Sequence, residues 1–548
     1  MVYCGKASKG CQNCRTRRIK CDRVQPQCTQ CVRVRKTCPG YRDPLSLMFR
    51  DESTKVMQKA QAQWQSETWE SSSSSSSPPD STRNQEPIPE STAPPPAAVT
   101  ASDSRKPAVS RGLTLEIGPT AVDKAIRFFV DRYVIGLPDE PRAGHELQEV
   151  PWVHSPRMRD ILAAVGMAGM SNLTDDKEMS TLAKHHYGLA LQRMAGAVRY
   201  VGSVELEMVM RTVVMMAMYE VIAGTDGPAR SIHVMGAAAI LRNALPAPQL
   251  PSEGPRALLQ LCFSTLSSKQ SSTQHSSSEP NVLIPTHIDS QCDPLPPALF
   301  GWIAAIDQMA SDEDKPSAKL VKIIARFVQL STGLRSHRFL DGHPKTADTI
   351  REALDINLSL KSWAQQQDNT PWAFTEEHID PPFFPPGTVF DNSYHIYTNT
   401  YIARAWNHYR WTHILTNQLL LEAATRFPIT STTLLPPSHQ HLARDLITHL
   451  ARDTLVSVPT HYRHPKLEPK HWDCFDKTNP GAVLGLPGVP TVLFQVKVAA
   501  CAPGVCRRYR EWALEMLETA WRDLGMVQAR VLAGFVREST LGVKEECE

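Results

Sequence analysis

Six cysteines near the N-terminus follow a repeated spacing, and this repeat constrains the fold more than any other feature of the chain. Two cysteines separated by two residues are followed, six residues later, by a third, and the same arrangement recurs at an offset of 17 residues. The positions are Cys11, Cys14, Cys21, Cys28, Cys31 and Cys38. Two thiolates at this spacing can hold one metal ion from a tight turn. The repeat therefore predicts two equivalent metal-binding halves, each with one short helix.

Zinc suits these ligands, because structural zinc takes four soft ligands in a tetrahedron, about 2.3 Å from each sulfur. Two zinc ions need eight ligand positions, whereas the repeat supplies six sulfurs. Six sulfurs are enough if two cysteines each bridge both ions, and the pseudo-symmetry favours equivalent cysteines of the two halves, such as Cys11 and Cys28, as the bridging pair. A four-ligand finger would leave two cysteines unused, and a disulfide knot would need an oxidising compartment. We therefore predict two zinc ions, which also supply the folding energy of this segment.

The segment that carries the cysteines is strongly basic. Residues 1–42 hold eleven Lys and Arg against a single acid, Asp22, which gives a net charge of +10, while the remainder of the chain carries −7. Four of the six residues between the second and third cysteines are basic: Arg15, Arg17, Arg18 and Lys20. The matching segment of the second half, "VRVRKT", has three. Because both halves share the metal spacing, the denser charge points to an anionic partner, and we predict double-stranded DNA.

The stretch "CRTRRIKCDRVQPQC" (residues 14–28) resembles the fungal Zn₂Cys₆ binuclear-cluster DNA-binding domain. The likeness lies in the basic run after the second cysteine, the Cys-Asp pair, and the proline two residues before the fourth cysteine. It implies six thiolates around two zinc ions, with Cys11 and Cys28 bridging. A pure metal store fits less well, because storage needs neither the basic run nor so long a chain.

The resemblance also implies roles for the basic residues. The family's first short helix enters the major groove and reads a CGG triplet. Arg17 and Arg18, three and four places after the second cysteine, would then contact the bases. Arg15 and Lys20 would bind phosphates and set the register on DNA. Further phosphate contacts, or a nuclear import signal, are expected from Lys9, Arg33, Arg35 and Lys36.

Composition divides the rest of the chain. Residues 43–111 are predicted to be a linker, disordered over 71–110, where Ser and Pro dominate and too little apolar surface exists to offset chain entropy. Residues 112–540 show apolar residues at spacings of three and four, which predicts a large all-α domain. A short acidic tail, 541–548, completes the chain. No alternating strand pattern competes with the helical stretches. Those in the second half are predicted at 298–309, 317–332, 348–366, 394–423, 440–457 and 505–536, after a polar insertion at 266–280.

The large domain resembles the fungal-specific transcription-factor domain that follows such clusters in many regulators. The sequence segments that show this resemblance include "HHYGLALQRM", "MYEVIAGTDGPARSIHVMGAAAILR" and "YHIYTNTYIARAWNHYRWTHIL". The resemblance implies an all-α regulatory domain that responds to effectors or forms dimers, with no established catalysis. The predicted fold is thus a small zinc-cluster domain of two short helices around two zinc ions, a disordered linker and a large all-α domain.

Sequence signals for an enzyme are weak. The stretch "THYRHPKLEPKHWDC" gathers His461, His464, His471, Asp473 and Cys474, but prolines interrupt it and its histidines lack the helical i, i+4 spacing of a metal pair. His185 and His186 fit packing or surface roles, and the methionine run 208–218 fits a core. We therefore expect no enzyme. The alternative is a helical ligand-binding or enzymatic protein that carries a DNA-tethering zinc head.

These features together predict a zinc-dependent, sequence-specific regulator of transcription by RNA polymerase II, located in the nucleus. Its expected partners are double-stranded DNA and the transcription machinery or coregulators, with a homodimer among the expected assemblies. Control of a metabolic or secondary-metabolite gene cluster is the expected role. The most apolar stretch, 213–224, is interrupted by Glu220, and the N-terminus has no apolar signal region, so we expect no membrane association.

Overall fold

The computed structural model contains two compact units, Met1–Pro119 and Thr120–Glu548, which are considered separately and called the head and the body. It describes residues 11–39 (except 18, 23, 25, 26 and 37), 119–133, 154–197, 203–224, 236, 254–275, 281–287, 294–380, 383–462, 464–475 and 489–540. The predicted linker at 43–111 and the acidic tail at 541–548 lie outside these residues.

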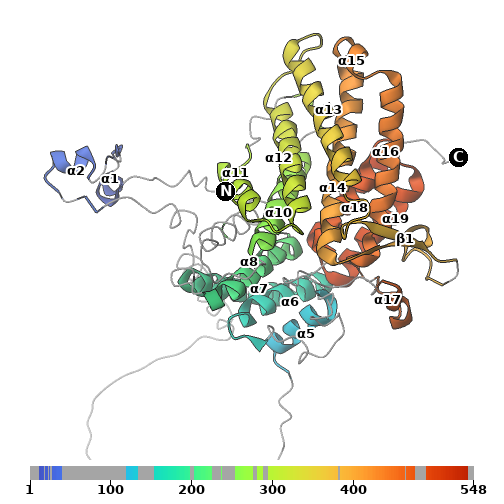
Figure 1. The fold of residues 1–548 in the computed structure, drawn as a ribbon. Coiled ribbons are helices and arrows are strands. Elements are labelled where there is room, and N and C mark those ends of the chain that lie inside the picture. The colour runs from blue at the N-terminus through green and yellow to red at the C-terminus, as the bar shows by residue number, and fades with distance from the viewer. Residues whose placement is uncertain are drawn as a thin grey trace, which may run out of the picture. The chain divides into compact units, whose positions relative to one another are not determined.

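The described part of the head has two short helices, α1 (Gln12–Thr16) and α2 (Thr29–Arg33), which repeat one local structure (Figure 1). The Ile19 N–H donates to the carbonyl of Cys14 at 3.0 Å, and the Lys36 N–H, 17 residues later, donates to the carbonyl of Cys31 at 3.1 Å. The sequence repeat is therefore also a repeat of backbone hydrogen bonds. Both helices are too short to be stable alone, so the cysteines must hold them.

The first part of the body is a group of four helices, which lie together in Figure 1. They are α5 (Ala121–Tyr133), α6 (Arg159–Thr174), α7 (Lys177–Ala197) and α8 (Ser203–Ala223). Helix α6 packs on the other three and is buried on almost all sides. Helix α5 approaches it closely at Gly166, where a Cβ atom would overlap the backbone carbonyl of Ala125.

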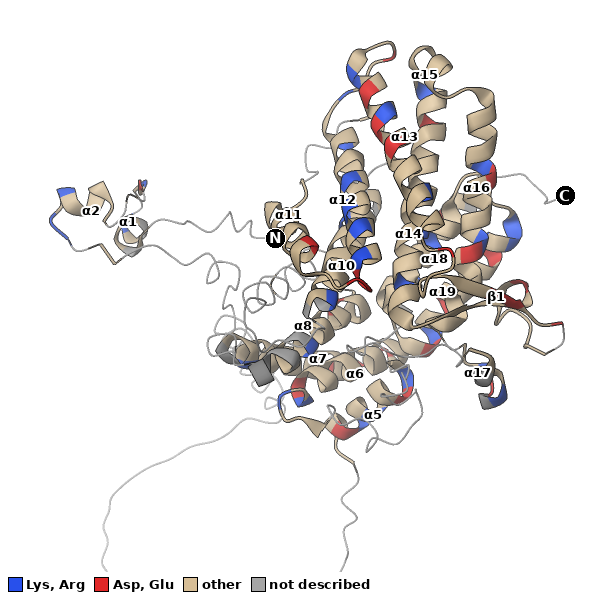
Figure 2. Ribbon diagram, in the orientation of Figure 1, with Lys and Arg blue, Asp and Glu red and all other residues tan. Residues whose placement is uncertain are grey.

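Eleven further helices are described in the rest of the body. They are α10 (Gly254–His275), α11 (Pro297–Met309), α12 (Lys315–Ser336), α13 (Pro344–Gln365), α14 (Thr400–Arg426), α15 (Pro428–Leu434), α16 (Pro437–Val456), α17 (Pro469–Phe475), α18 (Leu493–Cys501), α19 (Arg507–Leu524) and α20 (Val527–Thr540). Helix α14 lies at their centre, packed against α12, α13, α16 and α18. Its residues 401–420 are all buried, including charged and polar ones. Helix α12 carries basic residues and α13 carries both acidic and basic ones (Figure 2), and they form ion pairs such as Arg326 with Glu352.

The predicted all-α class is confirmed for the body as a largely helical domain, although one hairpin was not predicted. Strands β1 (Phe374–His378) and β2 (Ser393–Tyr397) pair antiparallel, with Phe374 opposite Tyr397. The predicted helix at 394–423 therefore begins only at Thr400, because the side chain of Asn399 accepts the N–H of Ile402 at 2.9 Å and caps the helix there. A five-residue strand is too short to show a clear alternation.

Two other helix boundaries differ from the predictions. The polar insertion predicted at 266–280 is largely helical, since α10 continues to His275. Its polar side chains have buried partners: Gln270 donates to Ser331 at 3.2 Å, and Gln274 accepts from Lys497 at 2.9 Å. The helix predicted at 505–536 is two helices, because Gly525 adopts a positive φ of 64° and ends α19.

A candidate zinc centre and nucleic-acid interface

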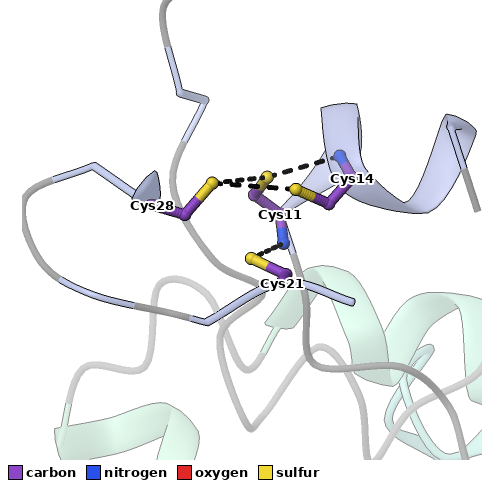
Figure 3. Close-up of side chains that lie close together, drawn as sticks. All are labelled: Cys11, Cys14, Cys21 and Cys28. Carbon is purple, nitrogen blue, oxygen red and sulfur yellow. Dashed lines mark hydrogen bonds between the residues drawn. The ribbon is translucent and has the colours of Figure 1, made fainter. Parts of the chain in front are cut away.

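The cysteine sulfurs of the head form two overlapping groups of four. One group is Cys11, Cys14, Cys21 and Cys28, and the other is Cys11, Cys28, Cys31 and Cys38. Within each group, the ligand atoms all lie within 4.8 Å of one another. Figure 3 shows the four side chains of the first group close together. The two groups share Cys11 and Cys28, so two metal ions could use six sulfurs if these two cysteines bridge.

The distances between sulfurs match those expected around zinc. The Cys11 sulfur lies 3.7 Å from that of Cys28 and 3.6 Å from that of Cys31, and the sulfurs of Cys14 and Cys28 are 3.7 Å apart. A regular tetrahedron with bonds of about 2.3 Å has edges of about 3.8 Å. The donor set and its spacing therefore fit two tetrahedral zinc ions, which confirms the predicted cofactor in chemical terms.

Backbone N–H groups surround these sulfurs. The N–H of Cys14 points at the sulfur of Cys11 at 3.5 Å, and the N–H of Cys31 points at that of Cys28 at 3.3 Å. The Nδ2 of Asn13 donates to the Cys31 sulfur at 3.6 Å across the two halves. Hydrogen bonds of this kind stabilise a thiolate and orient it toward a metal. The tight turns at the starts of α1 and α2 thus prepare the shared sulfurs for a cation.

Burial of the sulfurs makes the cluster sensitive to protons. Burial raises the pKa of the Cys11 thiol to about 12, and it also raises the pKa values of Cys14 and Cys28. Without a metal these groups are neutral thiols at neutral pH. Zinc binds thiolates, so its binding must release their protons. The affinity of the head for zinc therefore falls as the pH falls.

Asp22, the single acid among residues 1–42, has a structural role that sequence reasoning missed. The hydroxyl of Thr29 donates to its carboxylate, and the Thr29 N–H lies 3.2 Å from Oδ1 and 3.1 Å from Oδ2. These hydrogen bonds lower the pKa of Asp22. The carboxylate thereby ties the loop after Cys21 to the first turn of α2. The signal was available, because an acid directly after the third cysteine is out of place in so basic a segment.

The structure describes some of the predicted DNA-binding residues. Arg17 and Lys20 are exposed just after α1, and the N–H of Arg17 donates to the carbonyl of Asn13 at 3.1 Å. Arg15 belongs to α1, but its side chain, like the whole of Arg18 and Lys9, lies outside the described residues. The basic residues of the second half, Arg33, Arg35 and Lys36, are all exposed. A compact, buried sulfur cluster therefore carries cations on its surface, where an anionic partner can reach them.

The histidines near residue 465 are parts of the packing. His461, His464 and His471 are buried, and the ring of His461 lies 3.0 Å from the amide of Asn407. Nδ1 of His464 accepts the N–H of Lys466 at 3.2 Å, and Nδ1 of His471 accepts that of Glu468 at 2.9 Å. Each of these rings thus forms a hydrogen bond with a nearby backbone N–H or with a side chain of α14, which favours a structural role. The side chain of Asp473 lies outside the described residues, and Cys474 is partly buried.

A second group of candidate ligands, not predicted from the sequence, consists of Glu376, His395 and Asp453. Two terminal nitrogens of Arg452 already bind the carboxylate of Glu376, at 2.9 and 2.6 Å. Nη2 of Arg410 lies 3.3 Å from Nδ1 of His395. A guanidinium can only donate, so Nδ1 accepts and the ring proton lies on Nε2, the atom that would have to bind a metal. The group is therefore best explained as a partly buried polar network, in which His395 and Asp453 are buried and Glu376 is exposed.

Two other predictions concern the first helices of the body. His185 is exposed, and Nδ1 of the half-buried His186 lies 3.0 Å from Oδ1 of Asp160, consistent with surface and packing roles. Met215, Met216 and Met218 of α8 are buried in the core, as the methionine run predicts. Among the described residues, no helix is both long and apolar enough to cross a membrane.

Comparison with known proteins identifies both units. Residues 9–47 match the fungal Zn(2)-Cys(6) binuclear cluster domain, and residues 153–444, more than half of the chain, match the fungal specific transcription factor domain. White-opaque regulator 2 of Candida albicans is 56% identical over 34 residues, which cover 6% of this chain and 8% of the relative. The match thus spans less than a tenth of that protein's length. No solved structure matches the chain.

Proposed function

This chain belongs to the fungal specific transcription factor family and is a DNA-binding regulator of transcription, and from this premise we propose that it recognises CGG-type half-sites and controls transcription by RNA polymerase II in the nucleus. The observation that carries the proposal is the pairing of a largely buried six-sulfur cluster with exposed cations at the end of α1. The cluster holds the basic residues in a fixed position, where an anionic partner such as DNA can contact them.

In this proposal the six cysteines of the head would hold two zinc ions, and the sulfurs of Cys11 and Cys28, which belong to both groups of four, would be available to both ions. Bound zinc supplies folding energy and holds the two halves together. The chain's own contribution is to aim the thiolates through the N–H groups of Cys14 and Cys31, and to tie α2 to the loop after Cys21 through Asp22.

Recognition is assigned to the residues at the end of α1. Arg17 and Arg18 contact guanine edges in the major groove, where the arginine fork matches O6 and N7. Arg15 and Lys20 bind phosphates, which adds affinity without reading the sequence. The exposure of Arg17 and Lys20 supports this assignment.

The body is proposed to be the regulatory part, which acts through coregulators or the transcription machinery and supports a homodimer. Control of a metabolic or secondary-metabolite gene cluster is part of the same proposal. The body's buried histidines bond to neighbouring residues within the helical core, which favours regulation over catalysis.

Selection of bound DNA from a random pool tests the proposal directly. The full chain, loaded with zinc, should enrich sequences that contain CGG triplets. The orientation and spacing of these triplets would show how copies of the chain are arranged on DNA. The same selection after removal of zinc by a chelator should enrich nothing. Enrichment of unrelated sequences would overturn the CGG assignment, and unchanged enrichment without zinc would overturn the role of the cluster.

A further inference from the structure

A short segment of the body, residues 281–285, is held in an unusual way. This segment, here called the strap, has the sequence "NVLIP" and forms neither helix nor strand. Its adjacent side chains Leu283 and Ile284 are 0% and 4% exposed. Because two neighbouring side chains are both buried, the body must surround the strap on more than one side.

The strap's main chain is bound by three side chains of α12 and α14: Arg335, Gln418 and Glu422, here called the strap site. Nε2 of Gln418 donates to the carbonyl of Asn281 at 2.6 Å, and Nη2 of Arg335 donates to that of Val282 at 2.6 Å. Oε2 of Glu422 accepts the N–H groups of Leu283 and Ile284, both at 2.9 Å. Four consecutive residues thus each give a backbone group to a side chain of the strap site.

The partners of these backbone groups are side chains, two of them charged. Buried backbone groups need hydrogen-bond partners, and here Arg335, Gln418 and Glu422 provide them. Arg335 is fully buried, and burial raises the pKa of Glu422, so both charged groups have lost solvation. Side chains that bind main-chain groups set the register of a peptide, while apolar contacts select its side chains. The strap site therefore has the chemistry of a peptide-recognition site.

We propose that the strap site binds a segment of a partner protein that presents two adjacent large aliphatic residues with free backbone N–H groups, and that the strap occupies the site as an intramolecular competitor. The chemistry of the partner is read from the strap itself, since the site contacts its main chain and two aliphatic side chains. The inference does not rest on DNA recognition, because every residue involved belongs to the body.

Competition has a consequence for affinity. A tethered segment acts at an effective concentration on the order of millimolar. A partner peptide at micromolar concentration would therefore bind the intact chain weakly, and a change that releases the strap would strengthen its binding. The site thus links a conformational change of residues 281–285 to recruitment of the partner.

The test uses the full chain and a fluorescent peptide that copies residues 278–289, "SEPNVLIPTHID", with binding measured by fluorescence anisotropy. A variant with Leu283→Ser and Ile284→Ser should release the strap, and it should bind the peptide at least tenfold more tightly than the unaltered chain. Adding Glu422→Ala to this variant should remove that gain. A peptide with serine at the same two positions should not bind.

A matched control alters the same segment without releasing it. Thr286 and His287 are exposed, so the variant with Thr286→Ser and His287→Ser should bind the peptide as weakly as the unaltered chain. If the strap variant retains the circular dichroism of the unaltered chain but does not bind the peptide, the proposal is wrong. Binding that survives Glu422→Ala would contradict it equally.

Hydrogen exchange keeps the proposal testable if the strap variant fails to fold. In the unaltered chain, millimolar peptide should displace the strap and speed amide exchange at Leu283 and Ile284, while the serine peptide should leave both rates unchanged. Equal rates with and without the peptide would overturn the proposal. Neither outcome depends on DNA, so failure here is distinguishable from failure of the DNA selection.

Discussion

At the residue scale, the basic residues of the head should separate into two functional kinds. Arg15→Ala removes a proposed phosphate contact, so affinity should fall about equally for all sequences, and the slope of log affinity against log salt should become shallower by about one unit. Arg18→Ala removes a proposed base contact and should relax preference at one base pair, at a cost of about 1–3 kcal/mol for the preferred site. Titrations of each variant against the selected site and single-base variants of it would measure both effects. Identical behaviour of the two variants would refute the assignment.

Lys497 is a second residue whose environment makes a quantitative prediction. It is 1% exposed, its ammonium group donates to Gln274 at 2.9 Å, and burial lowers its pKa from 10.5 to about 8. The folded protein therefore binds fewer protons than the unfolded chain between about pH 8 and 10.5, and the free energy of unfolding should rise with pH across that window.

Lys497→Met should remove this dependence and stabilise the body near pH 7 by an amount on the order of 1–3 kcal/mol. Urea unfolding at pH 7.5 and pH 10 measures both effects. As a control, Gln274→Leu should destabilise the body at pH 7.5, because it leaves the ammonium group without that acceptor. A methionine variant that keeps the pH dependence would show that Lys497 is not its source.

At the scale of elements, the crossing of α5 and α6 depends on one missing side chain. A Cβ atom at Gly166 would overlap the carbonyl of Ala125, so Gly166→Ala should force the helices apart and destabilise the body by several kcal/mol. Gly188, in the middle of α7, has open space where its Cβ would be. Gly188→Ala should instead stabilise the body by about 0.5–1 kcal/mol. Urea unfolding of the two variants provides the comparison, and an equal effect of both would contradict the close crossing.

Helix α14 makes the body sensitive to acid. Burial lowers the pKa values of His408 and His413 to about 3, from an ordinary value of 6.5. His408 accepts from the Trp411 indole at 3.0 Å, and Nε2 of His413 lies 2.8 Å from Oδ1 of Asn357, so both rings are hydrogen-bonded inside the fold while burial disfavours their charged forms. Protons bind these histidines in the unfolded chain but not in the folded one as the pH falls below 6.5.

Stability should therefore decrease below pH 6.5 and continue to decrease toward pH 3. Each buried histidine contributes about 2 kcal/mol of loss between pH 7 and pH 5. Urea unfolding at these two pH values should show the loss, and His413→Gln should reduce it by about one histidine's share. A chain equally stable at both values would show that these rings become protonated without unfolding.

At the scale of the whole molecule, the head and the body depend on different forces. The head has a sulfur cluster as its core, whereas the body has an extensive core of buried aliphatic and aromatic side chains. Removal of zinc should therefore abolish DNA binding, while the far-ultraviolet circular dichroism and the thermal unfolding of the body change little. Zinc re-addition should restore DNA binding. Loss of most helical signal on chelation would show that the body also needs the metal.

The parts of the fold and site that could be predicted from the sequence are those with strong local signals. The ligand count required two shared cysteines, and the 17-residue offset made equivalent pairs, such as Cys11 and Cys28, the candidates. The helices of the second half were located by periodicity, within a few residues of the bounds of α11, α12 and α13. Fold class and zinc follow from these features, and the structure and the family matches confirm both.

Features that depend on contacts between distant residues could not be predicted. The polar end of α10 looks like a loop until Ser331 and Lys497 are placed beside it. The strands β1 and β2 are too short to show an alternating pattern, and although Asp22 stands out as a lone acid, only the structure identifies Thr29 as its partner. The assignment of bases and phosphates to Arg15, Arg17, Arg18 and Lys20 stays a prediction.

The sequence by itself determined the zinc chemistry, the basic character of the head and the helical class of the body. Each of these follows from residue type and spacing along the chain, because thiolate count, charge and helical period are local properties. Tertiary structure alone decided which cysteines lie in both sulfur groups, how closely α5 meets α6 at Gly166, and that Glu422 holds the backbone of residues 283 and 284. These depend on packing between segments far apart in the sequence, where the burial of one side chain is set by atoms that no local pattern specifies.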